Sequence, residues 1–335
     1  MDTVLVTGGA GFIGSNFIHF LISSSSYNVI NLDALTYAGN IKNLSSVEKD
    51  SRYRFIKGDI TSPEAIRQLV DLDFDYLVNF AAETHVDRSI LAPDRFILTN
   101  ILGTQNLLNL SLQKQIRKYI QISTDEVYGS LGREGFFSEN SPLDPTSPYS
   151  ASKASADLIV LAYFKTFDLP VNITRCSNNY GPYQFPEKLI PLMINNAVKN
   201  KPLPVYGDGS NIRDWIHVDD HCRGILQVME KGRSGDIYNM GGNSEKQNLE
   251  LVKTILEILG KPESLIRFVT DRKAHDWRYA VDYSKIRQEL RWAPQVKFTD
   301  GIRDTIAWYL NNQDWLEEIV SGEYQHYYEK MYSTR

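Results

Sequence analysis

Tyr149 and Lys153 form a Y-x-x-x-K pattern whose side chains could together take a proton from a hydroxyl group. The residues after Pro148 repeat apolar positions at helical spacing, and residues four apart on a helix lie on one face. A free phenol has a pKa near 10, so a tyrosine base near pH 7 needs its phenolate stabilised by about 4 kcal/mol. A neighbouring ammonium provides such stabilisation. In isolation, the same pair is more typical of exposed side chains on a solvated helix.

A hydroxyl and two acids, Thr124, Asp125 and Glu126, follow the apolar run Tyr119–Ser123. Ligands of open α/β sheets bind at the carboxyl ends of the strands, so these side chains could meet the Tyr/Lys pair in one crevice. Two close carboxyl groups push their pKa values apart, which suits one to act as an acid and the other as a base. Adjacent acids at a strand end are otherwise usually part of a solvated turn.

A glycine-rich loop, Gly8–Gly14, joins the predicted strand Val4–Thr7 to a helix that begins near Phe12. Glycines allow a tight turn and let backbone N–H groups approach a pyrophosphate, which the positive helix N-terminus attracts. Such loops also occur without ligands, but this one has the strand-then-helix setting that a dinucleotide site requires. The residues predicted to contact the cofactor here are Gly8, Gly11, Phe12, Ile13 and Gly14.

Asp33 ends the second predicted strand about 20 residues after Gly14, where an acid binds the ribose hydroxyls of a dinucleotide. A carboxylate there would repel a 2′-phosphate, so NAD is favoured over NADP. Asp59 and Ile60 end the third strand and could reach the adenine, although Asp59 could equally be a turn residue. The positive nicotinamide ring would add to the stabilisation of a Tyr149 phenolate.

Residues 1–180 alternate short β-branched runs with amphipathic helical stretches, a pattern typical of βαβ units. One predicted helix covers Pro93–Gln113. Six strands with helical crossovers predict an α/β fold with a doubly wound parallel Rossmann sheet. The predicted strands are Val4–Thr7, Val29–Asp33, Arg54–Gly58, Tyr76–Phe80, Tyr119–Ser123 and Val171–Arg175.

After Gly181 the pattern loosens and prolines become frequent. We predict an NAD-binding domain over residues 1–180 and a smaller substrate domain over 181–335, and no clean linker separates them, so we expect them to be partly interleaved. The helices predicted in the second domain are Glu187–Lys199, Asp219–Lys231 and Leu249–Leu259.

The composition argues against several classes of protein. The chain has 36 Lys and Arg against 41 Asp and Glu, a net charge of −5, so nucleic acid is not an expected partner. Its two cysteines, Cys176 and Cys222, form neither a disulfide scaffold nor a zinc motif, and the histidines lack metal-ligand spacing. No apolar run approaches the roughly 20 residues that span a bilayer. We expect no metal, no membrane partner and a cytoplasmic location.

The segments Thr7–Gly14 and Tyr149–Lys153 resemble those of the extended short-chain dehydrogenase/reductase superfamily. Within it, four further segments are similar to the dTDP-glucose 4,6-dehydratase family, and the likeness runs from Val4 to about Trp308. The Thr-Asp-Glu run is the specific signal, because sibling epimerases and decarboxylases lack the Asp-Glu pair. The four segments are Ala82–Ser89, Thr124–Glu126, Cys176–Pro182 and Glu187–Pro191.

The resemblance implies dehydration of dTDP-glucose to dTDP-4-keto-6-deoxyglucose, with NAD recycled in each turnover. Tyr149, assisted by Lys153, would take the proton of the 4-hydroxyl, and Thr124 would hydrogen-bond the same oxygen. Glu126 would remove the proton on carbon 5 that the new ketone acidifies. Asp125, protonated, would give its proton to the leaving 6-hydroxyl.

The resemblance also implies a nucleotide-sugar site, in which Asn179 and Arg213 contact the diphosphate. Arg213 could instead pair with Asp208 or Asp214. The other implied contacts are Glu187, Lys188 and Leu189 at the pyrimidine, Pro204 and Tyr206 on its face, Arg272 and His275 near the phosphates, and Thr84 and Arg88 near the sugar or cofactor.

Three positions depart from the family pattern, since Ala274 stands where glycine is usual, Trp277 where arginine is frequent, and Thr84 where serine is more common, which keeps the hydroxyl. Rival readings are a UDP-glucose 4,6-dehydratase, a nucleotide-sugar 4-epimerase or a UDP-glucuronate decarboxylase. A non-enzymatic NAD-binding regulator is a rival of another class. Family members usually dimerise through two helices, which here would be about Pro93–Gln113 and Tyr149–Phe167, so we expect a homodimer.

Overall fold

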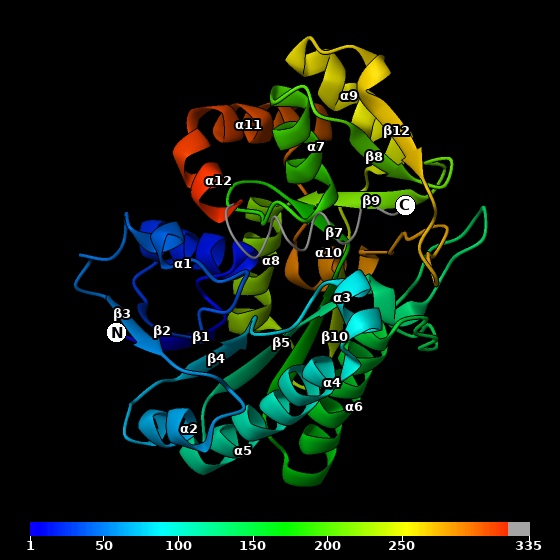
Figure 1. The fold of residues 1–335 in the computed structure, drawn as a ribbon. Helices are drawn as coiled ribbons and strands as arrows, with labels where there is room; N and C mark the ends of the chain where they lie inside the picture. Colours follow the sequence, from blue (N-terminus) through cyan, green and yellow to red (C-terminus); the bar gives the residue numbers. More distant parts are fainter. Residues whose placement is uncertain (321–335) are drawn as a thin grey trace.

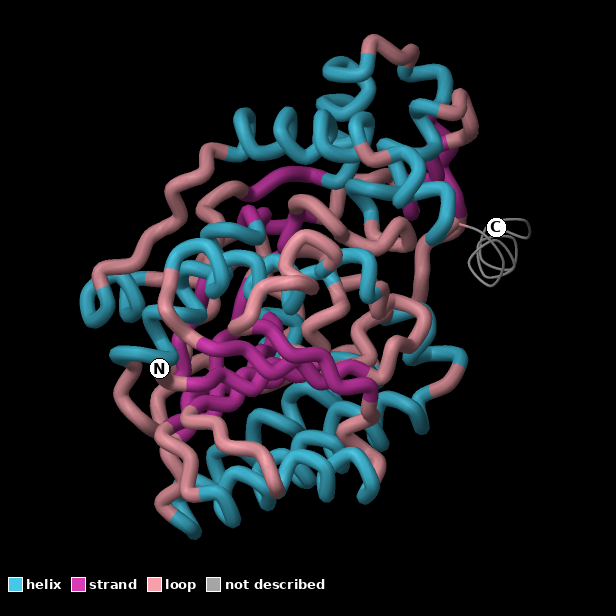
Figure 2. The backbone as a smooth tube through the Cα atoms, turned by 90° about the vertical axis from the view of Figure 1, so that its left-hand side faces the viewer, coloured by secondary structure: helices cyan, strands magenta, loops and turns pink. Residues whose placement is uncertain are grey.

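The computed structural model describes residues 1–320, and its centre is a parallel seven-stranded sheet between two layers of helices (Figures 1 and 2). The strand order is β10-β6-β5-β4-β1-β2-β3, which is a doubly wound α/β sheet as predicted. The strands of this sheet are β1 (Thr3–Thr7), β2 (Asn28–Asp33), β3 (Tyr53–Lys57), β4 (Tyr76–Asn79), β5 (Lys118–Thr124), β6 (Val171–Cys176) and β10 (Ile237–Met240).

One face of the sheet packs on α1 (Phe12–Ser24), α8 (Val218–Lys231) and α10 (Ser284–Leu290). The opposite face packs on α2 (Pro63–Val70), α5 (Thr104–Lys114) and α6 (Pro148–Phe167). The strands are nearly continuous apolar runs because helices cover both of their faces. The smaller unit lies above this sheet in Figure 1.

The prediction of six strands was wrong by one, because β10 adds a seventh beside β6. It lies within the half of the chain that was predicted as the substrate domain, and α8 of the same half packs on the main sheet. A four-residue strand carries too short a pattern to be identified locally. Its place is set by tertiary contacts instead.

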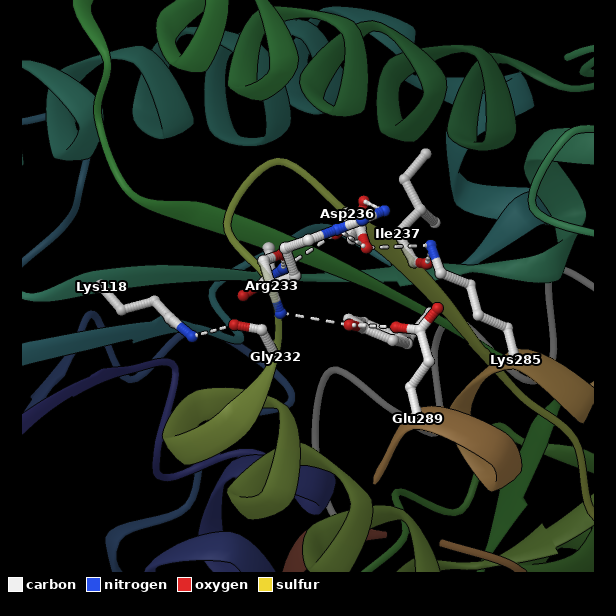
Figure 3. Close-up of polar contacts among 9 residues, drawn as sticks. Lys118, Gly232, Arg233, Asp236, Ile237, Lys285 and Glu289 are labelled. Atoms are coloured by element: carbon white, nitrogen blue, oxygen red, sulfur yellow. Dashed lines mark hydrogen bonds and ion pairs between the residues drawn. The ribbon is translucent and has the colours of Figure 1, made fainter. Parts of the chain in front are cut away.

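Figure 3 shows the polar contacts that hold β10 in place. Lys285 of α10 donates to the carbonyl of Ile237 at 2.9 Å, and the Tyr238 hydroxyl donates to Glu289 at the same distance. Lys118 at the start of β5 is buried, and its ammonium donates to the carbonyl of Gly232 just beyond α8, at 2.5 Å. A cation at a helix C-terminus is stabilising, so this lysine fixes α8 to the sheet.

The predicted helix Pro93–Gln113 is three segments in the structure: α4 (Pro93–Phe96), a π-helical stretch over Ile97–Gly103, and α5. Asn100 lies in this stretch, and its side chain accepts from the backbone N–H of Glu83 and donates to the Glu83 carbonyl. π-helical turns of this kind are frequent at functional sites. The short helix α3 (Val86–Leu91) precedes this region.

The smaller unit contains two small sheets, ordered β11-β9-β7 and β12-β8. Helix α7 begins two residues after the predicted start, because Lys188 is extended. The strands are β7 (Asn178–Tyr180), β8 (Leu203–Tyr206), β9 (Ile212–His217), β11 (Glu245–Gln247) and β12 (Ile266–Val269), and the helices are α7 (Leu189–Val198), α9 (Asn248–Leu259), α11 (Phe298–Asn311) and α12 (Gln313–Ile319). Within residues 1–320, no helix is long and apolar enough to cross a membrane.

Candidate active site

A cavity of about 300 Å³ lies where the carboxyl ends of β1, β2, β4 and β5 meet. Every residue that the sequence predicted to contact the cofactor lines this cavity. These residues are Gly8, Gly11, Phe12, Ile13, Gly14, Asp33, Asp59, Ile60, Tyr149 and Lys153.

The glycine loop, Gly8–Gly14, has no room for side chains at two of its glycines. Gly8 has φ +71, and a Cβ there would lie 2.6 Å from the backbone nitrogen of Ala81. A Cβ on Gly14 would lie 2.4 Å from the carbonyl oxygen of Gly8. No side chain caps the first turn of α1, whose positive N-terminus follows the loop. These features fit the pyrophosphate of a dinucleotide.

Asp33 is held rigidly at the rim of this cavity. One carboxylate oxygen accepts from the N–H of Ala10 at 2.8 Å and the other from the N–H of Leu35 at 2.7 Å. Burial raises its pKa, and the two backbone donors oppose that shift. Asp59 accepts from the backbone N–H and the hydroxyl of Thr61, both at 2.8 Å, as a turn residue does, and it also lines the cavity. Its contact with the adenine stays a prediction.

Tyr149 and Lys153 project from the first turns of α6. Ser147 and Ser150 form a reciprocal cap at the start of this helix, with Pro148 in its first turn. The Lys153 ammonium donates to the carbonyl of Ile122 on β5 at 2.6 Å. This bond fixes the start of α6 against the sheet.

Several groups around Tyr149 shift the pKa of its phenol. Burial raises the pKa of the Tyr149 phenol, and Glu126 and Cys176 raise it further, while the Thr124 hydroxyl opposes them. Lys153 is itself buried, which lowers its pKa. Within the protein itself, burial and the nearby acids favour the neutral phenol.

The acid pair stands at the end of β5, as predicted, and neither side chain is turned out to bulk solvent. Thr124 donates to one oxygen of Asp125 at 3.3 Å, and its hydroxyl accepts from the N–H of Glu126 at 3.2 Å. Asp125 is 2% exposed, and its second oxygen is buried with no hydrogen-bond partner. Glu126 lines both this cavity and its neighbour.

Their surroundings separate the two carboxyl groups. Burial raises the pKa of Asp125 well above its usual value, and the charges of Glu126 and Asp214 add to the effect. Burial also raises the pKa of Glu126, but the cations Arg272, Lys188 and Arg213 oppose the shift. Asp125 is thus suited to carry a proton, and Glu126 to accept one.

A second cavity of about 160 Å³ adjoins the first and belongs mainly to the smaller unit. The two share Thr84, Glu126, Asn178, Glu187 and Lys188 in their walls. The residues of the predicted nucleotide-sugar set that line the second cavity are Thr84, Glu187, Lys188, Leu189, Pro204, Tyr206, Arg213, Arg272 and His275.

Two residues of that set lie elsewhere. Asn179 lines the first cavity, and its amide is engaged with the protein, since its oxygen contacts Nδ1 of His221 at 2.9 Å. Arg88 lines neither cavity. Its guanidinium lies behind Glu187, to which it donates at 3.0 Å.

Arg213 is stacked over the ring of Tyr279 at 4.4 Å and donates to the carbonyl of Asp276 at 2.9 Å. Its alternative partners are engaged elsewhere: Asp208 accepts from Ser210, and Asp214 accepts from the N–H of Gly242. The guanidinium of Arg213 is therefore oriented by the backbone carbonyl of Asp276 and the ring of Tyr279. Neither Asp208 nor Asp214 pairs with it.

The segment from Arg272 to Trp277 lies beside the second cavity. The Nε of Arg272 is buried with no hydrogen-bond partner, and His275 contacts Asp271 at 2.6 Å. Burial, Arg272 and Arg213 lower the pKa of His275 to about 4. Ala274 has φ +52, so it occupies the left-handed conformation that explains the usual glycine.

Sequence reasoning missed several residues in the walls of the first cavity. The loop after Asp33 contributes Thr36 and Gly39, and the loop before α7 contributes Gln184 and Phe185. The first pair could have been found from its closeness to Asp33 along the chain. The second pair carried no local signal.

Comparison with known proteins agrees with this geometry. The family described as GDP-mannose 4,6-dehydratase matches residues 5–305. The dTDP-glucose 4,6-dehydratase of Xanthomonas campestris pv. campestris is 50% identical, over 97% of this chain and 98% of that protein. The chain belongs to the dTDP-glucose 4,6-dehydratase family.

Solved structures of this family superpose closely on the chain. The family member DesIV from Streptomyces venezuelae, determined with NAD bound, has a TM-score of 0.92 at 50% identity, covering 95% of this chain and 99% of that one. The enzyme from Bacillus anthracis, in complex with NAD, has a TM-score of 0.89 at 51% identity, covering 95% and 100%. The fold predicted from the sequence is therefore confirmed.

Proposed function

We propose that this protein is an NAD-dependent lyase that dehydrates dTDP-glucose to dTDP-4-keto-6-deoxyglucose. The observation that carries the proposal is the Asp125–Glu126 pair at the end of β5. Asp125 is buried and lines neither cavity, whereas Glu126 is half-buried and lines both, sharing the wall of the first with Tyr149 and Lys153. The family relatives of the same name, and their structures with NAD, support it. NAD, which the glycine loop and Asp33 would hold, would supply the hydride acceptor and donor that the reaction requires.

The chain's own residues have distinct tasks in this reaction. Tyr149 takes the proton of the 4-hydroxyl, and Thr124 hydrogen-bonds that oxygen. Glu126 removes the proton on carbon 5, which the 4-ketone acidifies, and the nearby cations favour its charged form. Asp125, kept protonated by burial, delivers its proton to the leaving 6-hydroxyl, so that water departs.

The second cavity is our proposed nucleotide-sugar site. Arg213 and Arg272 bring positive charge to the diphosphate, as two guanidinium groups suit phosphate oxygens. Pro204 and Tyr206 offer an apolar wall to the pyrimidine, and Lys188 stands between the two cavities. Asn179 is proposed to reach the diphosphate from the first cavity.

An epimerase or a regulator accounts for less of the site. An epimerase needs no acid and base at carbons 5 and 6, so Asp125 and Glu126 would be idle, although burying the carboxyl group of Asp125 costs free energy. A regulator has no use for any of the five residues assigned to catalysis. Both alternatives leave the best-positioned groups of the cavity unexplained.

The decisive experiment uses dTDP-glucose carrying deuterium at carbon 4. We expect the keto-sugar product to form without added NAD and to carry the label at carbon 6. Loss of the label to solvent, or a C4 epimer as the product, would refute the proposed reaction. A panel of dTDP-, UDP- and GDP-glucose separates a dTDP enzyme from a UDP enzyme.

We further propose a homodimer in the cytoplasm. Five large apolar side chains on the two helices predicted to form the dimer interface are more than 40% exposed. Groups of exposed apolar side chains often mark interaction surfaces, and a dimer interface would bury these five. They are Ile97, Leu98, Leu102, Leu158 and Phe167. Sedimentation equilibrium tests the dimer. The cytoplasmic location rests on the low cysteine content and stays a prediction.

A further inference from the structure

Two loops from distant parts of the chain close over the cofactor cavity. Residues 34–40 follow Asp33, and Thr36 and Gly39 of this loop line the cavity. Residues 181–188 precede α7, and Phe185 of that loop lines the cavity from the other side. Contacts between these loops therefore decide how easily the cavity opens.

Tyr37 makes the direct contacts between the loops. Its hydroxyl donates to one carboxylate oxygen of Glu187 at 3.0 Å, and its ring meets the ring of Phe185 edge-on, with centroids 5.5 Å apart. The Glu187 side chain is 2% exposed. A hydrogen bond to a buried carboxylate is stronger than one between neutral groups, so this link resists opening.

Arg88 completes the arrangement from α3. It donates to the second oxygen of Glu187 at 3.0 Å, and its guanidinium lies 3.8 Å from the centre of the Tyr37 ring. Both Glu187 oxygens are thus engaged, and the Tyr37 ring packs between a cation and an aromatic edge. We call Tyr37, Arg88, Phe185 and Glu187 the clasp.

We propose that Tyr37 is a positioning residue that holds the clasp shut and retains NAD throughout the turnover. This inference rests on the proposed function, because a hydride taken from carbon 4 must return to carbon 6 of the same sugar. An enzyme that lost its cofactor between the two transfers would be left inactive, with the sugar oxidised at carbon 4. Glu187 also lines the nucleotide-sugar cavity, so the clasp joins the two binding sites.

The first test measures NAD retention without substrate. Tyr37→Phe removes one hydroxyl and leaves Glu187 paired with Arg88, and we expect NAD to dissociate about tenfold faster than from the parent. Tyr27→Phe is the matched control, because it also removes a tyrosine hydroxyl bonded to a glutamate, Glu230, on the exposed surface. NAD released by denaturation after timed gel filtration is quantified for each protein.

The second test follows turnover with dTDP-glucose. We expect Tyr37→Phe to lose activity progressively and to regain it when NAD is added, whereas the parent and Tyr27→Phe need no added NAD. Glu187→Gln, which removes the charge from the same link, should also lose NAD faster, and melting curves check that each variant is folded.

The proposed role of the clasp would be refuted if Tyr37→Phe retained NAD as long as the parent does. It would also be refuted if Tyr27→Phe lost NAD as fast as Tyr37→Phe does. The proposed function can fail separately from the clasp, since NAD retention is measured without substrate. A parent protein that does not convert dTDP-glucose refutes the reaction, while faster NAD loss from Tyr37→Phe would still support the clasp.

Discussion

Gly14→Ala is the sharpest probe of the cofactor cradle. The new methyl group would lie 2.4 Å from the carbonyl oxygen of Gly8 and 2.8 Å from the Cα of Gly9. Carbon and oxygen in contact are about 3.3–3.6 Å apart, so the loop or the start of α1 must move by about 1 Å. Both neighbours are backbone atoms, and no side chain can rotate to make room.

The size of the effect differs between folding and binding. Overpacking costs about 1–3 kcal/mol, but alanine gains about 1 kcal/mol of helix propensity over glycine, so the free energy of unfolding should fall by no more than about 2 kcal/mol. A misplacement of about 1 Å costs a preorganised site far more, on the order of 100-fold. We therefore expect a folded Gly14→Ala protein whose NAD affinity falls about 100-fold.

The assay is calorimetric titration with NAD after the bound cofactor has been removed, together with urea unfolding. Gly132→Ala is the matched control, because a Cβ there meets nothing within 4 Å. The control should bind NAD as the parent does. NAD affinity of Gly14→Ala within about threefold of the control would show that the loop does not form the pyrophosphate cradle.

Three further changes test the acid pair and its support. Glu126→Gln should permit oxidation but block elimination, so that the absorbance of reduced nicotinamide builds up on adding substrate; parent-like turnover would contradict the assigned base. Asp125→Asn should lower turnover by about 10²–10⁴. The same change should raise the free energy of unfolding in urea, and the gain should grow as the pH rises above 3.8. Above that pH the unfolded parent protein loses the proton of Asp125, whereas the folded parent keeps it, and this difference disfavours folding of the parent. A gain in free energy that does not change with pH would contradict this reasoning. Arg175→Met removes the cation that pairs with the buried carboxyl group of Asp157 at 2.9 Å, and the free energy of unfolding in urea should fall by about 3–5 kcal/mol. A fall of less than about 1 kcal/mol would refute a structural role for this ion pair.

Much of the sheet could be predicted because its strands are buried on both faces and therefore read as apolar runs between helices. β10 was missed because its four residues contribute little pattern, and their partners are Lys285 and the neighbouring strand β6. The π-helical turn was missed for a similar reason. Asn100, which lies in that turn, bonds to Glu83, and this contact with a residue outside the helix carries no local sequence signal.

Some residues of the candidate site could be named from the sequence, and others only from the fold. Residues with proposed roles in the chemistry, such as Asp125 and Glu126, stand in short local motifs at strand ends and could be named from the sequence. The clasp could not, because Tyr37 and Glu187 are 150 positions apart and only the fold brings them together. Arg88 was named as a ligand-side residue, whereas its guanidinium lies behind Glu187 and acts on the site through it.

The state of Tyr149 ties these features together. Burial and Glu126 raise the pKa of its phenol, while the ammonium of Lys153 is committed to the carbonyl of Ile122 at 2.6 Å. A bound nicotinamide ring would bring further positive charge to this cavity in its oxidised state, which would favour the phenolate. In the reaction that we propose, removing the proton would then be easiest while the cofactor can accept a hydride. An enzyme built this way depends on keeping its cofactor in place, which is the task that the geometry gives to the loops joined by Tyr37.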